Sequence, residues 1–310
     1  MHLFSTKLTT FIIFTTLIFP LFVFAEETFT PNEPLITFGR LIKNENIKHF
    51  PSKEEIENNP NPQVLGITTA LPTPEPISSS PSPVPPISPN SPTIKSYTIA
   101  VLGDSMVETL GQEMWHLKTA LHQYYPYAHF NLLNYGDPAT DAEFGLHRLT
   151  NDFDQMGTRY PSLLSRRPDI VVVESFAYNP WGDGQNDIDR HWLTIAKMID
   201  AIKTASPQTK IILAATIAPN ANVFGDGVLN WDAAGKLTKT NTIKKYLQNI
   251  INFAGSEHYP LADSYHASLG SDGNGLLQYM SGDHLHPSGP GGMLFSQKIA
   301  DAIWENHLID

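Results

Sequence analysis

Proline is distributed so unevenly along this chain that the first third cannot fold as the remainder does. Of its 25 prolines, twelve fall between Pro51 and Pro92, and only ten lie in the 218 residues that follow. Proline lacks a backbone N–H and holds the chain extended, so residues 26–95, rich in proline and serine from Leu71 onward, are predicted to form a semi-rigid spacer. A passive disordered leader is the simpler alternative.

The first 25 residues have the layout of a secretory signal. Lys7 precedes an uncharged apolar run from Leu8 to Ala25, and Glu26 follows at once. This pattern predicts a signal peptide. An uncleaved membrane anchor is the alternative, because about 18 apolar residues reach the lower limit for spanning a bilayer. Both predict a secreted or extracytoplasmic protein, with the spacer tethering it to a membrane or cell wall in the second case. The stretch Leu35–Ile42 is predicted as a strand or a docking segment.

Composition excludes several classes of function. The chain carries a formal net charge of −11, and such an acidic surface repels phosphate backbones, so we expect no nucleic-acid partner. It contains no cysteine, which excludes disulfides, thiolate zinc sites and a cysteine nucleophile. The absence of thiols also suits an oxidising compartment outside the cytoplasm.

Residues 96–310 alternate short apolar runs with helical periodicities. The predicted strands are Tyr97–Leu102, Phe130–Asn134, Asp169–Glu174, Lys210–Thr216 and Tyr259–Ala262, and the predicted helices are Val107–Tyr124, Ala142–Arg167, Ile188–Thr204, Ala233–Ala254 and Gly292–Glu305. Strands that are apolar throughout indicate a parallel sheet covered on both faces. We therefore predict an α/β fold, a three-layer α/β/α sandwich with a five-stranded parallel sheet. Its functional site should lie beyond the carboxyl ends of the strands.

The first of these strands runs directly into Gly103-Asp104-Ser105. A serine at such a corner lies at a helix N-terminus, where backbone N–H groups and the helix dipole can stabilise an oxyanion. Ser105 is therefore a candidate nucleophile. Its alternative role is simply to cap the helix that follows.

A second polar cluster, Ser281-Gly-Asp-His-Leu-His-Pro-Ser288, precedes the last helix. Asp283 and His286 are three positions apart, a spacing that lets the carboxylate orient the imidazole toward a hydroxyl. His284 competes for the same role. The alternative is an ordinary polar loop that carries the start signal of the helix.

Taken together, the two clusters resemble the SGNH (GDSL-type) hydrolase family, from Tyr97 to the C-terminus. The resemblance implies a flavodoxin-like fold, acyl transfer to serine, and no metal or organic cofactor. The catalytic residues that it implies are Ser105, Asp283 and His286. The oxyanion hole that it implies consists of Ser105, Gly136 after the second strand, and Asn179 after the third. Here the sequence departs from the family pattern, and Asn186, in a literal Gly-Gln-Asn-Asp, is the alternative to Asn179.

The function implied is that of a secreted or surface-tethered serine esterase. Its expected substrate is a small ester or an acylated carbohydrate, with O-acetyl groups as the simplest case. An O-acyltransferase on the same fold and a non-catalytic cell-wall-binding relative remain alternatives. Aromatic residues on or near loops are candidate substrate contacts: Tyr124, Tyr125, Tyr178, Trp181 and Trp231.

Overall fold

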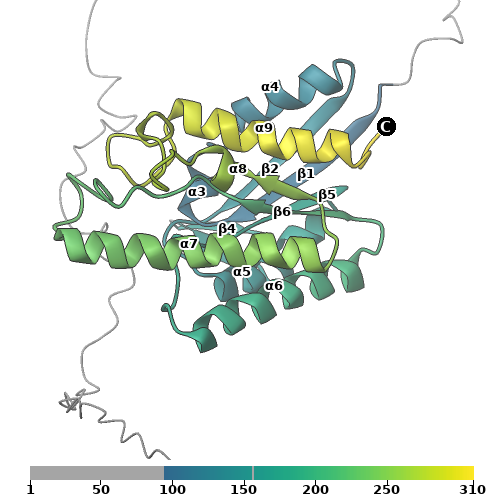
Figure 1. Cartoon of the computed structure of the whole chain (residues 1–310). Coiled ribbons are helices and arrows are strands. Elements are labelled where there is room, and N and C mark those ends of the chain that lie inside the picture. Colours follow the sequence, from purple (N-terminus) through teal and green to yellow (C-terminus); the bar gives the residue numbers. More distant parts are fainter. Residues whose placement is uncertain (1–93, 156) are drawn as a thin grey trace, which may run out of the picture. The chain divides into compact units, whose positions relative to one another are not determined.

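The computed structural model describes residues 94–155 and 157–310 (Figure 1). The segment 1–25, the stretch Leu35–Ile42 and nearly all of the predicted spacer lie outside the described residues. Among the helices of the two described ranges, none is both long and apolar enough to cross a bilayer.

A five-stranded parallel sheet forms the centre of the fold, as the sequence predicts. Its strands are β1 (Ser96–Gly103), β2 (His129–Gly136), β5 (Ile170–Glu174), β6 (Lys210–Ala215) and β7 (Leu261–Asp263). They lie in the order β2-β1-β5-β6-β7, and every pairing between neighbours is parallel. Counted along the chain, this is the 2-1-3-4-5 order of flavodoxin-like sheets. The predicted fold class is confirmed.

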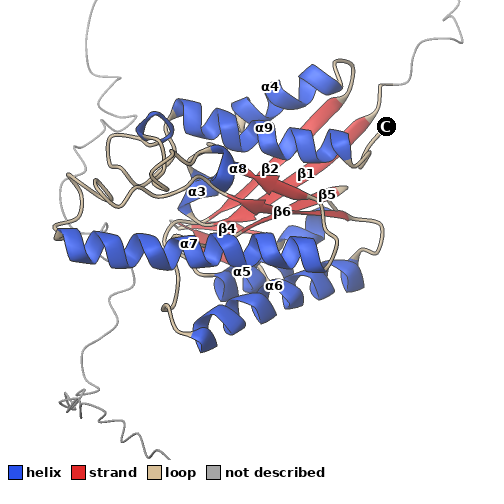
Figure 2. Ribbon diagram, viewed as in Figure 1, coloured by secondary structure: helices blue, strands red, loops and turns tan. Residues whose placement is uncertain are grey.

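Helices cover both faces of the sheet (Figures 1 and 2). They are α3 (Ser105–Glu108), α4 (Trp115–Tyr124), α5 (Ala142–Thr150), α6 (Gln185–Ala205), α7 (Ala233–Ser256), α8 (Ser264–Ala267) and α9 (Gly289–Glu305). Helices α4 and α9 lie side by side on one face, and α5, α6 and α7 cover the other. The sheet is thus the middle of three layers.

Alternation along each strand divides the buried core into two parts. In β1, Ile99 and Val101 face α4 and α9, whereas Ala100 and Leu102 face the opposite layer. All four side chains are fully buried. Successive strand residues point to opposite faces, so a strand that is apolar at every position fits only between two layers.

The predicted helix over 107–124 is interrupted in the structure. It is replaced by the single turn α3 and the separate helix α4, because Gly111 and Met114 between them take positive φ angles of 75° and 39°. Asn134 in β2 fixes α3 and the loop between α3 and α4, because its Nδ2 donates to the carbonyls of Val107 and Gly111 at 3.0 and 2.9 Å.

The predicted helix over 142–167 is wrong beyond its first turns. Helix α5 ends at Thr150, and the chain then forms a hairpin of β3 (Phe153–Gln155) and β4 (Thr158–Tyr160), followed by a 3₁₀ turn over Leu163–Arg166. The hairpin packs aromatic side chains against one another, with the rings of Phe153 and Tyr160 stacked 5.4 Å apart. Cross-strand aromatic pairs of this kind stabilise a short hairpin.

Candidate active site

Ser105 lies at the carboxyl edge of the sheet, directly after β1. The strand ends at Gly103, Asp104 caps α3 through a 2.9 Å hydrogen bond from the Met106 N–H to its Oδ1, and half-buried Ser105 is the first residue of the helix. A Cβ on Gly103 would lie 2.3 Å from the Cγ2 atom of Val107. The tight corner that presents Ser105 therefore requires glycine at this position.

Asn179 is joined to this corner by a hydrogen bond. Its Nδ2 donates to Asp104 Oδ2 at 2.8 Å, which brings the loop after β5 beside the residue that precedes Ser105. Phe176, with φ 51°, turns the loop, and the Asn179 N–H donates to the Phe176 carbonyl. The alternative residue, Asn186, is exposed in the first turn of α6. Of the two asparagines, only Asn179 contacts the Gly103-Asp104-Ser105 corner.

Asp283 and His286 form a close pair in the loop before α9. The Nδ1 atom of His286 lies 2.7 Å from Asp283 Oδ2, and the second carboxylate oxygen accepts the N–H groups of Leu285 and His286, each at 3.0 Å. Burial alone would raise the pKa of Asp283, but hydrogen bonds from His286, Ser281 and the two backbone amides hold it well below its usual value. The carboxylate is therefore charged across the physiological pH range.

The charges of both Asp283 and Asp104 act on Tyr178, in the loop after β5, so this pair lies near the Ser105 corner. Met106 and Leu285, the neighbours of Ser105 and His286, lie in the same hydrophobic cluster with Tyr178. Burial raises the pKa of Tyr178 well above its usual value, and the charges of Asp104, Glu174 and Asp283 raise it further. Burial raises the pKa of Asp104, and hydrogen bonds from Met106 and Asn179, followed by an electrostatic effect of His286, oppose that shift. Within the described residues the Ser105 hydroxyl forms no hydrogen bond with His286; such bonds often tighten only when substrate binds.

Gly136 does not present its N–H as predicted. The amide donates to Asn134 Oδ1 at 2.8 Å, so it is already occupied within β2. A Cβ at this glycine would lie 2.2 Å from the backbone nitrogen of Glu108, so Gly136 is required because α3 passes directly over it. Three residues on, Ala139 takes the left-handed conformation at φ 59°. In the described parts of the chain its N–H donates to no other group.

A buried arginine, which sequence reasoning missed, binds the ends of the first two strands together. Arg148 donates to the Tyr135 carbonyl at 2.6 Å, the Gly103 carbonyl at 2.9 Å and the Thr140 hydroxyl at 3.0 Å. Burial lowers its pKa to about 10, so the guanidinium stays charged at neutral pH. These bonds bring the loop of Ala139 close to the corner of Ser105.

Glu174 is a second residue that the sequence did not single out. It ends β5 and is fully buried beside Asp104. Its carboxyl group accepts hydrogen bonds from the Ser175 hydroxyl at 2.5 Å and the Phe176 N–H at 2.8 Å. Burial, and then the charge of Asp104, raise its pKa well above the usual range. The sequence does contain an indication of this role: a glutamate ends the otherwise apolar strand Ile-Val-Val-Val. Charged residues are almost never fully buried without partners, so such a glutamate is expected to have a specific role.

His284 and a second Asp–His pair are not part of the candidate active site formed by Ser105, Asp283 and His286. His284 takes a positive φ of 52°, and its Nδ1 is 3.5 Å from the Asp226 carbonyl. Asp263 and His266, at the end of β7, form an equally close pair at 2.6 Å. Two strands, β5 and β6, separate β7 from β1 in the sheet. The spacing Asp-x-x-His therefore brings carboxylate and imidazole together in both loops. The two pairs differ in their position in the fold, because Asp263 and His266 lie at the edge strand β7.

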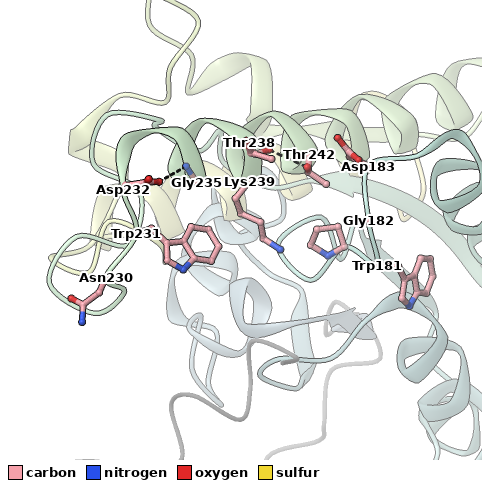
Figure 3. A pocket seen from close by; sticks show the side chains of 11 residues that line it. Trp181, Gly182, Asp183, Asn230, Trp231, Asp232, Gly235, Thr238, Lys239 and Thr242 are labelled. Carbon is pink, nitrogen blue, oxygen red and sulfur yellow. Dashed lines mark hydrogen bonds between the residues drawn. The ribbon is translucent and has the colours of Figure 1, made fainter. Parts of the chain in front are cut away.

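A cavity of about 720 Å³ opens beside Trp181, which follows Asn179 by two residues in the chain (Figure 3). Its walls come from the loop after β5 and the start of α7, and include Pro180, Trp181, Trp231 and Lys239. Of the aromatic candidates, Trp181 and Trp231 line this cavity, whereas Tyr178 is buried and is not part of its lining. Tyr124 is the last residue of α4 and Tyr125 follows it, and both rings pack against Trp304. No group of three or more potential metal ligands occurs in residues 94–155 and 157–310.

The GDSL-like lipase/acylhydrolase family model matches residues 101–292, which is more than half of the chain. The match includes the Gly103-Asp104-Ser105 corner and Asn179. The chain belongs to this family, whose members are ester-hydrolysing enzymes. The match confirms the resemblance recognised in the sequence.

Several solved structures are similar to the chain at low sequence identity. A lipase/acylhydrolase from Enterococcus faecalis is 18% identical with a TM-score of 0.48, covering 68% of this chain and 96% of its own. A GDSL-like lipase from Bacteroides thetaiotaomicron is 18% identical, with a TM-score of 0.49 over 68% and 89%. An acetylxylan esterase from Geobacillus stearothermophilus is 15% identical, with a TM-score of 0.47 over 68% and 95%. A comparison with curated protein sequences found no match.

Proposed function

We propose that this protein is a serine esterase in which Ser105 is the nucleophile, His286 the general base and Asp283 the residue that orients the base. The observation that carries the proposal is the 2.7 Å contact between His286 Nδ1 and Asp283 Oδ2. His286 also acts electrostatically on Asp104, the residue before Ser105. With the Nδ1–H donating a hydrogen bond to the carboxylate, Nε2 is left unprotonated and can accept a proton.

The reaction proceeds in two acyl-transfer steps. Ser105 Oγ attacks the ester carbonyl while its proton passes to His286 Nε2, and the resulting imidazolium then protonates the departing alcohol. Water attacks the acyl-serine in the second step, gives its proton to the same nitrogen, and releases the acid with Ser105 restored. Asp283 stabilises the imidazolium in both steps and keeps the ring in the required tautomer.

Three donors are proposed for the oxyanion. The N–H of Ser105 is at the start of α3, and the side-chain amide of Asn179 retains one N–H after its bond to Asp104. Because the Gly136 amide is occupied, we assign the third donor to the N–H of Ala139. Donors fixed in place before reaction stabilise the developing charge without reorganising.

Export and tethering belong to the same proposal. They are supported by the apolar run from Leu8 to Ala25 and by the proline-rich spacer that follows it. A protein outside the cytoplasm meets acylated carbohydrates, and O-acetyl groups on such polymers are the substrate class we propose. Fractionation of expressing cells tests this part: activity confined to the cytoplasm would contradict it.

The proposed chemistry is tested by turnover of p-nitrophenyl acetate. Wild type should release p-nitrophenol, and Ser105→Ala should reduce kcat by a factor of about 10⁴ or more, because the residual catalysis then comes only from the oxyanion hole and binding. Adding a carbohydrate acceptor separates hydrolysis from transfer. Acetate should accumulate in proportion to p-nitrophenol; acetylated acceptor in place of acetate would establish the acyltransferase instead. Absence of turnover in wild type would leave a non-catalytic binding protein.

A further inference from the structure

Glu174 is a fully buried acidic residue that the proposed reaction does not use. It is the last residue of β5, and its side chain has no exposure to solvent. Charged residues are almost never fully buried unless they are paired, because taking a charge out of water is costly. A carboxyl group kept at this point, where the strand meets the loop of Asn179, therefore requires a physical explanation.

The carboxyl group of Glu174 fixes the first turn of the loop after β5. Its Oε2 accepts the Phe176 N–H at 2.8 Å, and its Oε1 lies 2.5 Å from the Ser175 hydroxyl oxygen. Phe176 takes a positive φ of 51°, which is an unfavourable conformation for a bulky residue. The Asn179 N–H donates to the Phe176 carbonyl at 3.1 Å. Glu174 thus stabilises the strained turn on which the position of Asn179 depends.

The same carboxyl group lies against the corner that precedes Ser105. Strands β1 and β5 are neighbours in the sheet, and a Cβ on Gly103 would lie 2.9 Å from the Cβ atom of Glu174. The carboxyl group also accepts a hydrogen bond from the backbone N–H of Asp104. Glu174 therefore contacts both segments that are joined by the hydrogen bond from Asn179 to Asp104.

Glu174 is the neutral member of a buried pair of carboxyl groups. Burial, and then the charge of Asp104, raise the pKa of Glu174 well above its usual value. Burial also raises the pKa of Asp104, but its hydrogen bonds, followed by the electrostatic effects of His286 and Arg148, oppose that shift. Two like charges this close disfavour each other, so the proton belongs on the group whose charge is less well stabilised. A protonated Glu174 adds no negative charge beside a developing oxyanion.

We propose that Glu174 is a positioning residue for the reaction: its carboxyl group holds the loop after β5 so that the Asn179 amide is fixed beside the Ser105 corner. The inference rests on the proposed esterase function and on the assignment of Asn179 as an oxyanion donor. Because Glu174 is fully buried, it does not touch the substrate and acts through Asn179. Its effect should therefore disappear when the Asn179 amide is absent.

A double-mutant cycle with p-nitrophenyl acetate tests this dependence. Glu174→Met, of similar length but without hydrogen bonds, should lower kcat by up to about 10² and leave KM unchanged. Added to Asn179→Ala, it should cause no further loss. Glu174→Gln should retain kcat near that of wild type, because its amide accepts the Phe176 N–H and donates to the Ser175 hydroxyl oxygen as a neutral acid would. Losses that multiply in the double variant, or a glutamine variant as impaired as the methionine variant, would overturn the proposal.

The cycle needs a control for a loss of stability without a loss of positioning. The loop has a second support, because His191 Nε2 donates to the Ser175 carbonyl at 2.8 Å, so the Glu174→Met protein should still fold. Thr209→Val is the matched control: it removes a buried hydrogen bond to the Pro168 carbonyl, at the opposite end of the strands. This variant should melt at a lower temperature and keep the kcat of wild type. A kcat that falls in Thr209→Val as far as in Glu174→Met would mean that stability alone explains the effect, and would overturn the proposal.

Hydrogen–deuterium exchange tests the positioning apart from catalysis. The amides of the peptide that covers residues 174–180 should exchange faster in Glu174→Met than in wild type, and Glu174→Gln should match wild type. Equal exchange in all three proteins would overturn the proposal. If wild type hydrolyses no ester but exchange differs as expected, the esterase is rejected, whereas the positioning of this loop by Glu174 is retained.

Discussion

The amide of Asn179 donates to the carboxylate of Asp104, Nδ2 to Oδ2, across 2.8 Å. This bond joins the loop after the third strand of the sheet to the corner that presents Ser105. Asp104 is fully buried, and burial raises its pKa, while the hydrogen bonds from Met106 and Asn179 oppose that effect. The amide is thus hydrogen-bonded to a fully buried carboxylate in the residue before Ser105, and a donor held in this way suits the oxyanion role that we propose for it.

Asn179→Ala should lower kcat for p-nitrophenyl acetate by about 10²–10³, which corresponds to about 3–4 kcal/mol of transition-state stabilisation. KM should change little, because the donor acts on charge that develops during reaction. Steady-state kinetics measures both. Asn186→Ala is the control: its side chain is exposed in α6, so its kinetics should match wild type. Loss of activity in Asn186→Ala with normal Asn179→Ala would reverse the assignment.

His286→Ala should abolish esterase activity, because it removes the base that we propose for Ser105, whose ring is held by Asp283. The chain offers a close control in His266, which pairs with Asp263 in the same Asp-x-x-His geometry but at the far edge of the sheet. His266→Ala should retain wild-type kcat, and so should His284→Ala. Inactivity of either control, in a protein that still melts cooperatively, would mean that the triad is misassigned.

Gly136→Ala distinguishes a steric role of this glycine from a donor role. Alanine keeps the N–H, but its Cβ would lie 2.2 Å from the Glu108 backbone nitrogen and push α3 away from β2. The free energy of unfolding should fall by about 1–3 kcal/mol, as for other overpacked sites, and activity should fall with it. Denaturant titration provides the measurement. Gly255→Ala in α7, where a Cβ meets no atom within 4 Å, should leave both quantities unchanged. A fully stable but inactive Gly136→Ala protein would contradict the steric explanation.

Buried His191 should make the protein less stable in mild acid. Its Nε2 donates to the Ser175 carbonyl and its Nδ1 accepts from Asn249, which fixes a neutral ring. Burial lowers its pKa from 6.5 to about 4, so below pH 6.5 the unfolded chain binds a proton that the folded protein does not. The contribution of His191 to the free energy of unfolding is fully present above pH 6.5. It should fall by about 3 kcal/mol as the pH drops to 4.

Urea titrations at a series of pH values measure this slope. His191→Gln should flatten it between pH 6.5 and 4, whatever its effect on stability at neutral pH. His147→Gln, which removes an exposed ring, should keep the slope of wild type. An unchanged slope in His191→Gln would mean that another group controls the acid response.

Those parts of the fold that depend on local pattern were predictable from the sequence. Ile170–Glu174 is apolar at nearly every position, so both its strand and its burial follow from composition alone. The break of the helix predicted over 107–124 depends instead on the positive φ of Met114, an unusual conformation for a non-glycine residue that propensity does not foresee. The β3–β4 hairpin depends on tertiary packing of Phe153 and Tyr135.

The same division holds for the candidate site. Asp283 and His286 are close in sequence, so their pairing follows from spacing. The occupied amide of Gly136 depends on the side chain of Asn134 two residues earlier, and the network of Arg148 joins residues up to 45 positions apart. Contacts of this kind form only after the strands have assembled into the sheet. Local sequence patterns therefore cannot predict them.

The central claim is that the Ser105 hydroxyl is the nucleophile, and covalent labelling with a fluorophosphonate tests it directly. Intact mass spectrometry followed by peptide mapping should find one adduct per chain, on the peptide that contains Ser105, and none in Ser105→Ala. Labelling of wild type should also fall sharply in His286→Ala, since the hydroxyl then has no base. An adduct on another residue, or labelling that persists in Ser105→Ala, would contradict the account.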